Sequence, residues 1–293
     1  MIVFYGHQRL TMKKFYSICK KAICIDAEYF PNNDPQWNKF EISPCNADIN
    51  ITCEISNSFP ELSNSIKSGD FIISVKDDTV HRAFPMGKIF GSLTEYTPSD
   101  TSQSKTFFTP RSFPIMMDNR YIWSSLSLTQ LLLTQNSLFI HASFIAANNK
   151  AILFSAPCGT GKSTQADLWK KYRNAEIING DKAGILIENG IHACGVPFCG
   201  TSGICENKII SLGAIVLLSQ NKTNVIKRLN GAEAFQAVMK NIYLDFIAPY
   251  ERLKCTDLII KLVSDVPVYH LACTPDENAV ITLENTLKSE GVI

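Results

Sequence analysis

The chain has 293 residues, of which 45% are hydrophobic and 19% are charged. This composition supports a buried core and excludes a mainly disordered chain or a coiled coil. Its 28 basic and 27 acidic residues give a net charge of +1, so no overall field would collect nucleic acid or an anionic membrane. The length corresponds to one large or two ordinary domains of about 100–200 residues.

Ten cysteines are spread along the chain without a CxxC pair. The closest group, Cys194, Cys199 and Cys205, lacks the paired spacing of zinc ligands. The first residues do not show the basic start, apolar run and small-residue cleavage site of a secretory signal. No apolar run approaches the length of about 18 residues that a membrane span needs. We therefore expect a cytoplasmic protein with free thiols and no membrane association.

Residues 1–115 predict a small β-rich domain, with a structural or acceptor-binding role. Short apolar stretches such as 23–25 and 71–75 alternate with turn-rich pieces, and the alternating apolar residues of 48–55 are typical of a half-buried strand. The polar stretch 97–106 is predicted to be an exposed loop.

The pattern changes in the second part of the chain, 116–293. Apolar residues recur over 121–134 without Gly or Pro, which predicts a helix. Strands and helices then alternate, which is typical of an α/β fold. Strands are expected at 138–147, 151–155, 175–179, 184–188, 191–194, 213–219, 224–229 and 267–273, and helices at 162–172, 231–240, 248–264 and 276–288.

The strongest motif is the segment 151–164, AILFSAPCGTGKST, in which an apolar strand leads through a glycine-rich turn into a helix. Gly159 and Gly161 can adopt backbone angles that are closed to other residues. The amides of such a turn and the helix N-terminus together bind phosphate. Lys162 can reach the β- and γ-phosphates, and the Ser163 hydroxyl can bind Mg²⁺. We predict that ATP is held by Pro157, Cys158, Gly159, Thr160, Gly161, Lys162, Ser163 and Thr164.

The motif departs from the usual GxxxxGK[ST] pattern at one position. Ala156 stands where the first glycine is expected, and alanine does not adopt a positive φ cheaply. The alternative is a capped helix that binds no ligand. A dinucleotide-binding GxGxxG motif is excluded because Thr164 occupies its third glycine position.

Two further residues are candidates for the chemistry of phosphate transfer. Asp181 follows the strand expected at 175–179, so that it would face the same crevice as the phosphate loop and act as metal ligand or as base. His141 lies in the strand expected just before the loop strand, although a histidine in an apolar strand is also often structural. Asp167 lies on the helix of the loop itself and is expected to face solvent.

The segment 195–203, GVPFCGTSG, is a third feature. Its glycines and hydroxyl residues could offer backbone and side-chain donors to an anionic or peptide substrate. The alternative is an ordinary irregular connection.

Taken together, four segments resemble the catalytic domain of HPr kinase/phosphorylase: HAS from His141, SAPCGTGKST at 155–164, IINGDK at 177–182 and GVPFCGT at 195–201. The catalytic domain of that family is in turn similar to the nucleotide-binding part of ATP-dependent phosphoenolpyruvate carboxykinase. The resemblance covers roughly 120–285. The whole chain is similar to stand-alone HPr-kinase-like proteins encoded beside ribosomal-peptide tailoring genes, including lasso-peptide kinases.

This resemblance implies a P-loop kinase domain that uses ATP and Mg²⁺, with Ser163 and Asp181 at the metal and His141 beside the transferred phosphate. Asp181 and Lys162 would complete the catalytic set. The family usually carries two adjacent aspartates, whereas Gly180 precedes Asp181 here. One carboxylate therefore stands where the family has separate groups for base and metal ligand.

The sequence thus predicts an ATP- and Mg²⁺-dependent kinase that phosphorylates a Ser or other hydroxyl of a peptide or small protein. A small-metabolite kinase with the same site and a nucleotide-sensing module without transfer chemistry remain as alternatives. HPr kinases form hexamers, and the resemblance leaves a homo-oligomer open.

Overall fold

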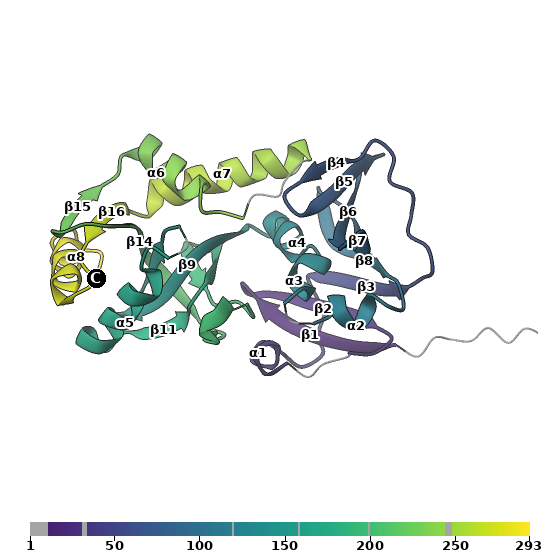
Figure 1. Cartoon of the computed structure of the whole chain (residues 1–293), viewed down its shortest axis with the longest axis horizontal. Coiled ribbons are helices and arrows are strands. Elements are labelled where there is room, and N and C mark those ends of the chain that lie inside the picture. The colour runs from purple at the N-terminus through teal and green to yellow at the C-terminus, as the bar shows by residue number, and fades with distance from the viewer. Residues whose placement is uncertain (1–10, 31–33, 119, 158, 199, 244–247) are drawn as a thin grey trace, which may run out of the picture. The chain divides into compact units, whose positions relative to one another are not determined.

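A computed structural model describes residues 11–30, 34–118, 120–157, 159–198, 200–243 and 248–293. The chain forms two compact units, one of Met1–Ser17 with Lys21–Leu131 and the other of Ile18–Lys20 with Leu132–Ile293. Each unit is built on its own sheet, so the structure is a mixed α/β protein (Figure 1). None of the cysteines that the structure describes forms a disulfide.

The first unit contains an eight-stranded sheet in the order β1-β2-β3-β8-β7-β6-β5-β4. Strands β2, β3 and β8 run parallel, whereas β8, β7, β6, β5 and β4 pair antiparallel in succession. Its elements are β1 Met12–Ile18, β2 Lys21–Ala27, α1 Pro35–Asn38, β3 Ile49–Ile55, β4 Ile66–Ser68, β5 Phe71–Lys76, β6 Thr79–Met86, β7 Ile89–Thr97, β8 Asp100–Phe108, α2 Phe113–Met116 and α3 Ile122–Ser125. The division between the units falls within the next helix, α4 Leu128–Thr134.

The polar stretch 97–106 is not an exposed loop, and the prediction from its composition was wrong. Most of it forms β8, which pairs with β3 on one side and β7 on the other. Two of its hydroxyl groups are buried and hydrogen-bonded: Thr101 Oγ1 donates to the carbonyl of Leu131 at 2.8 Å, and Thr106 Oγ1 lies 3.1 Å from Thr94 Oγ1. Short hydroxyl side chains can occupy a core once they have hydrogen-bond partners, so polarity alone did not mark exposure.

The helix predicted over 121–134 is interrupted. It appears as α3 and α4, separated at Ser127, which has a φ of 52°. Helices α2 and α3 pack on strands of the first sheet. For this reason the first unit extends to residue 131, whereas the sequence placed the end of the β-rich part near 115.

The second unit contains a sheet in the order β10-β9-β12-β13-β14-β16-β15, with β11 paired to β9. The elements expected beyond residue 136 are present, with their ends shifted by a few residues. They are β9 Ser137–Ala147, β10 Lys150–Ser155, α5 Lys162–Arg173, β11 Glu176–Asn179, β12 Lys182–Ile187, β13 Ile191–Cys194, the 3₁₀ turn η1 Gly200–Ser202, β14 Ile209–Gln220, β15 Val225–Arg228, α6 Gly231–Met239, α7 Pro249–Asp265, β16 Val268–Cys273 and α8 Glu277–Ser289.

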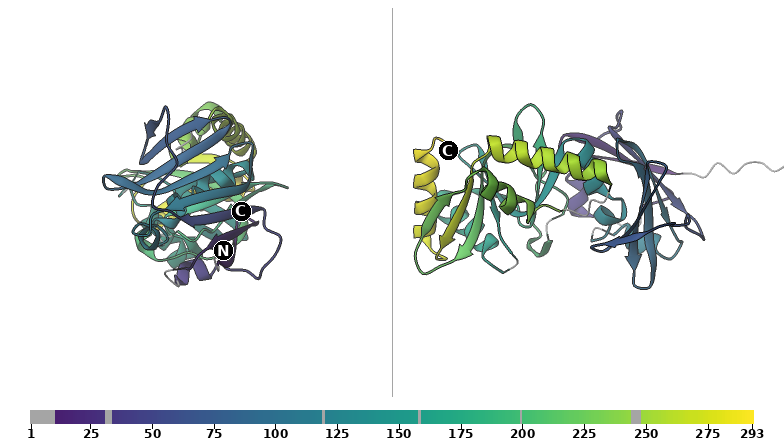
Figure 2. Two further views of the ribbon diagram at one scale, coloured as in Figure 1. Left: turned by 90° about the vertical axis from the view of Figure 1, so that its right-hand side faces the viewer. Right: turned by 90° about the horizontal axis from the view of Figure 1, so that it is seen from above.

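Helices cover both faces of this sheet (Figures 1 and 2). Alternate residues of β10 face opposite sides: Leu153 belongs to the core formed with α6 and α7, and Phe154 belongs to the core formed with α5 and α8. This alternation is the expected result of a strand buried on both faces. It explains why the strand leading into the phosphate motif is apolar throughout.

Three strands of the second sheet, β10, β14 and β16, are parallel. Their carboxyl ends therefore reach the same edge, where the segment 156–161 links β10 to α5. In open α/β sheets this edge is where ligands bind. The topology places the glycine-rich turn beside the ends of β14 and β16, which are far away in sequence.

Candidate functional site

The glycine-rich turn has the backbone geometry that its sequence predicted. Gly159 has a φ of 76° and Gly161 a φ of 117°, both in the region that favours glycine. Added Cβ atoms would meet no atom within 4 Å, so the backbone angles, and not lack of space, call for glycine. Ala156 does not adopt a positive φ, and the departure from the usual motif therefore causes no strain.

The helix that follows is open at its N-terminus. Gly161 is the N-cap of α5, and no side chain caps the helix. Unpaired amides at the start of a twelve-residue helix, with the positive end of its dipole, favour an anion. Ser163 and Thr164 are exposed in this first turn.

Lys162 lies inside the turn and not in solvent. Its side chain is buried, with 8% of the residue exposed, and its ammonium donates a hydrogen bond of 3.0 Å to the carbonyl of Ala156. A buried ammonium held by the loop backbone is well placed to neutralise phosphate oxygens that enter the turn.

Strand pairing brings His141 and Asp181 together. The register of β9 and β12 pairs His141 with Lys182, and the amide of Ala142 donates to the carbonyl of Asp181 at 3.0 Å. As a result His141 Nδ1 lies 3.5 Å from Asp181 Oδ1, and about 30% of each side chain is exposed. The two residues are separated by forty positions in sequence, so only the sheet register creates this pair.

The environment of His141 favours its neutral form. Burial lowers the pKa of His141 below its usual 6.5, and the positive charge of Lys162 lowers it further. The carboxylate of Asp181 acts in the opposite direction, but it does not outweigh the other two. A neutral imidazole can accept a proton, as a general base must.

Sequence analysis did not assign a role to Asn179, which holds the turn before Asp181. Its Oδ1 accepts hydrogen bonds of 3.0 Å from the amides of Asp181 and Lys182, and its Nδ2 donates to the carbonyls of Val196 and Phe198, also at 3.0 Å. The side chain is fully buried. An asparagine just before a turn is a common sequence feature, and nothing local revealed that it also ties in the segment after 195.

Lys182 is a second residue without a role in the sequence analysis. It is 5% exposed, and its ammonium lies 4.0 Å from the ring centres of both Phe198 and Tyr243. This cation–π arrangement places a second buried positive charge directly after Asp181. Burial and the nearby Asp181 raise the pKa of Tyr243 well above its usual value.

In the segment 195–203, several glycines are explained by packing. A Cβ at Gly195 would lie 1.8 Å from the carbonyl oxygen of Glu206, and one at Gly200 would lie 2.8 Å from Asp181 Cγ. The segment therefore passes directly over the acid. Cys199 and the side chain of Thr201 lie outside the described residues, as does Cys158 in the phosphate loop.

The glycine that precedes Asp181 also has a structural explanation. A Cβ on Gly180 would lie 2.2 Å from Ser202 Oγ and 2.6 Å from Ser202 Cβ. The side chain of Ser202 thus occupies the space into which an acid at position 180 would project.

These groups surround one cavity of about 270 Å³. Both the glycine turn and the His141–Asp181 pair contribute to its wall. It is lined by His141, Gly159, Gly161, Lys162, Ser163, Thr164, Gly180, Asp181 and Ser202. Lys162, Ser163, Asp181 and His141 therefore line the same cavity. Two other predicted residues do not line it: Thr160 lines a cavity of about 350 Å³, and Pro157 lines a cavity of about 750 Å³. Asp167 is exposed on α5, as expected.

The donor set fits Mg²⁺ in the presence of a polyphosphate. Among the described residues, no group of three or more His, Cys, Asp or Glu side chains could hold a metal ion. Mg²⁺ does not need such a cage, because it usually takes one or two protein ligands with phosphate oxygens and water. Ser163 and Asp181, which share one cavity, would supply a hydroxyl and a carboxylate.

Comparisons with known proteins add little to this geometry. No family model matches the chain, and no curated protein matches it. Among solved structures, the Hpr(Ser) kinase/phosphatase from Coxiella burnetii aligns with 53% of this chain and 96% of its own, at 10% identity and a TM-score of 0.31. That score is too low to support an argument about function. None of the helices in the described residues is long and apolar enough to cross a bilayer.

Proposed function

We propose that the second unit is an ATP- and Mg²⁺-dependent kinase that transfers the γ-phosphate to a hydroxyl group. The observation that carries this proposal is the composition of the central cavity. A phosphate-binding turn, a buried ammonium and a carboxylate–imidazole pair line the same 270 Å³. Phosphoryl transfer needs little more than positioning, neutralised charge and a proton acceptor.

In this proposal the turn and Lys162 hold the phosphates. The amides between Gly159 and Ser163 and the dipole of α5 would bind the β- and γ-phosphates. Lys162 would move its ammonium from the carbonyl of Ala156 to the phosphate oxygens, where negative charge develops during transfer. Mg²⁺, held by Ser163 and Asp181, would neutralise the same oxygens.

The His141–Asp181 pair would take the proton. The acceptor oxygen forms a bond to the γ-phosphorus while the bond from that phosphorus to the β,γ-bridging oxygen breaks, ADP leaves, and the acceptor hydroxyl gives up its proton. His141 is neutral for this task, and the carboxylate of Asp181 at 3.5 Å can stabilise the imidazolium that forms. In this scheme His141 would be the base, and Asp181 would be both its partner and a ligand of Mg²⁺.

The acceptor would approach from a larger cavity, of about 750 Å³. This larger cavity shares His141 with the central cavity, the one of about 270 Å³ described above. The segment 241–243 lies alongside β9. The carbonyl of Asn241 accepts a hydrogen bond from the His141 amide, and the amide of Tyr243 donates one to the carbonyl of Phe139. Polar groups of the cavity lining come from Lys240, Asn241 and Tyr243, and apolar surface comes from Leu217 and Ile242.

We take a peptide or small-protein hydroxyl as the acceptor, as the sequence resemblance implies. The larger cavity, of about 750 Å³, has room for a reacting side chain together with its chain neighbours. Its volume also lies within the range of about 300 to 1,000 Å³ of small-molecule sites, so a small-metabolite kinase is the alternative that the experiment must separate. The β-rich first unit is a candidate for further acceptor binding.

The test is phosphate transfer from MgATP to an array of Ser- and Thr-containing peptides, with free amino acids and sugars beside it. We expect peptide phosphorylation in the wild type. We expect a loss of about 10²–10³-fold in the Lys162→Ala variant, because a donor to the transition-state charge is removed.

Lys170→Ala is the matched control, since Lys170 is exposed on the same helix, and it should keep full activity. Turnover of a free metabolite without peptide phosphorylation would support the small-metabolite kinase instead. Tight MgATP binding with no product from any acceptor would support a nucleotide sensor, and full transfer by Lys162→Ala would contradict the site itself.

A further inference from the structure

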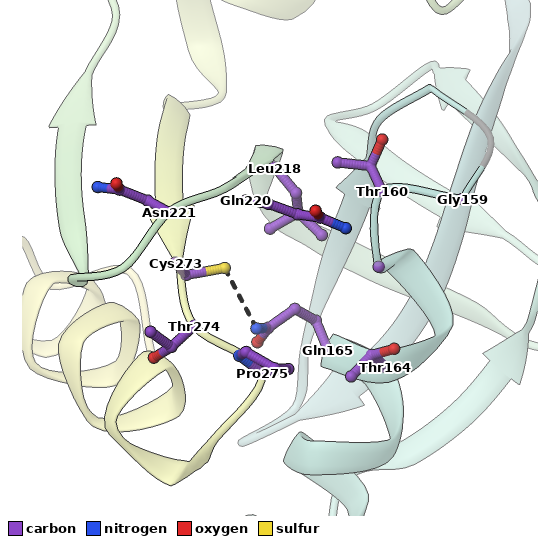
Figure 3. Close-up of a pocket in the computed structure, with 11 residues that line it drawn as sticks. Gly159, Thr160, Thr164, Gln165, Leu218, Gln220, Asn221, Cys273, Thr274 and Pro275 are labelled. Atoms are coloured by element: carbon purple, nitrogen blue, oxygen red, sulfur yellow. Dashed lines mark hydrogen bonds between the residues drawn. The ribbon is translucent and has the colours of Figure 1, made fainter.

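A second cavity, of about 350 Å³, lies on the other side of the phosphate turn (Figure 3). It opens between the first turn of α5 and the carboxyl ends of β14 and β16. It shares Gly159, Gly161 and Thr164 with the central cavity. A ligand whose phosphates rest on the turn can therefore continue into this second cavity without leaving the protein surface.

The walls of the second cavity suit a flat, partly polar ring. Leu218 and Pro275 supply apolar surface, while Gln220 and Asn221 supply carboxamides at the end of β14. Figure 3 shows the Gln220 side chain extending from the strand end toward Thr160. Gln220 is exposed, and its carboxamide makes no hydrogen bond to another of the described residues, so its donor and acceptor are both open to a ligand.

The floor of the cavity carries an unsatisfied acceptor. Gln165 of α5 is 2% exposed, and its Nε2 donates to Cys273 Sγ at 3.3 Å, which ties the phosphate helix to the end of β16. The Gln165 Oε1 atom is buried and has no hydrogen-bond partner among the described residues. Buried polar atoms are rarely left unpaired, and one in the wall of a cavity points to a donor that arrives with a ligand.

We propose that this cavity binds the nucleoside of the nucleotide whose phosphates lie on the turn, and that Gln220 selects adenine. A carboxamide presents an acceptor and a donor side by side, which match the N6 amino group and N7 of adenine. Guanine presents two acceptors, O6 and N7, at the same edge and leaves the carboxamide oxygen unpaired. The proposal rests on the proposed function, since the phosphates fix which end of the nucleotide reaches the cavity.

The test compares the binding of three magnesium complexes, ATP, GTP and inorganic tripolyphosphate, by titration calorimetry. We expect the wild type to bind ATP more tightly than GTP or tripolyphosphate. Gln220→Leu should weaken ATP about tenfold and reduce the preference over GTP, because one bidentate base contact is lost. Its affinity for tripolyphosphate, which does not enter the second cavity, should not change.

Gln236→Leu is the matched control, because Gln236 is an exposed glutamine of α6 outside this cavity. Gln165→Met provides a second variant at the floor and should also weaken ATP but not tripolyphosphate, with circular dichroism to verify folding. Unchanged ATP affinity in Gln220→Leu, or equal binding of ATP and GTP by the wild type, would overturn the proposal. If the wild type bound no tripolyphosphate and no nucleotide, the phosphate site itself would be wrong.

Discussion

The charge state of His141 decides which group of the central cavity can take a proton. Burial is the largest cause of its lowered pKa, and the ammonium of Lys162 adds to it. Both disfavour the imidazolium, so a larger fraction of His141 is neutral at pH 7 than of a histidine at the surface. In the proposed mechanism Lys162 would therefore serve two purposes, because it would attract phosphate and its charge lowers the pKa of His141.

This leads to a prediction about pH. The active form is the neutral imidazole, so kcat/KM should stay constant near neutrality and fall only when the pH drops through a value below 6.5, the usual pKa. His141→Gln should lower the rate by about 10²-fold or more, as loss of a general base does, and should remove the fall at low pH. A pH–rate profile of both proteins tests this, and an unchanged acid limb in His141→Gln would assign the titration to another group.

At the scale of elements, two connections are interlocked beside the site. The turn between β11 and β12 carries Gly180 and Asp181, and the 3₁₀ turn η1 carries Gly200 and Ser202. Gly200 packs against Asp181, and Ser202 fills the space at Gly180. The Asn179 side chain accepts a hydrogen bond from the amide of Asp181 and donates one to the carbonyl of Phe198, just before η1. Gly180 and Gly200 have no side chains, so the β11–β12 turn and η1 can approach each other closely. This close packing holds the carboxylate of Asp181 at the cavity wall.

The interlock predicts the effect of placing an acid at position 180. Gly180→Asp should destabilise the protein by about 1–3 kcal/mol, because its side chain must displace Ser202. The double variant Gly180→Asp with Ser202→Gly should recover much of this loss.

Urea unfolding measures both changes. Gly231→Asp is the control, since a Cβ at Gly231 meets nothing within 4 Å and an acid in the first turn of α6 is favourable. A single Gly180→Asp variant as stable as the wild type would show that the two connections move independently.

At the scale of the whole molecule, the chain is divided into two units with separate sheets. The proposed nucleotide contacts come from β9, β10, α5, β12, β14 and β16, all of which belong to the second unit. Binding energy from a nucleotide is therefore coupled first to the stability of that unit.

Hydrogen exchange should display this division. MgATP should slow amide exchange in segments 150–165 and 209–220, because a ligand that binds the folded state suppresses local opening. Segments 71–76 and 79–97, in the first unit, should exchange as before. Mass spectrometry of peptides with and without MgATP measures the difference, and equal protection of β5–β7 would contradict a site confined to the second unit.

The positive φ angles of Gly159 and Gly161 and the placing of Asp181 at a strand end followed from local sequence signals, and the structure adds that Lys162, Asp181 and His141 line one cavity. Glycine angles, the lysine that follows and an acid at a strand end are written in neighbouring residues. The strands and helices beyond residue 136 were likewise predictable from their apolar periodicity. The polar strand β8 and the break at Ser127 were not, because tertiary hydrogen bonds satisfy Thr101 and Thr106 and packing overrides local preference.

By itself the sequence determined that the chain folds on apolar strands and carries a glycine-rich turn between a strand and a helix, since backbone angles and periodicity depend on neighbours in the chain. Only the tertiary structure decided that His141 lies 3.5 Å from Asp181, that Asn179 anchors the turn between them, and that the ends of β14 and β16 form a cavity beside the turn. Such relations depend on sheet register and parallel strand order, which join residues up to a hundred or more positions apart and leave no local trace in the sequence.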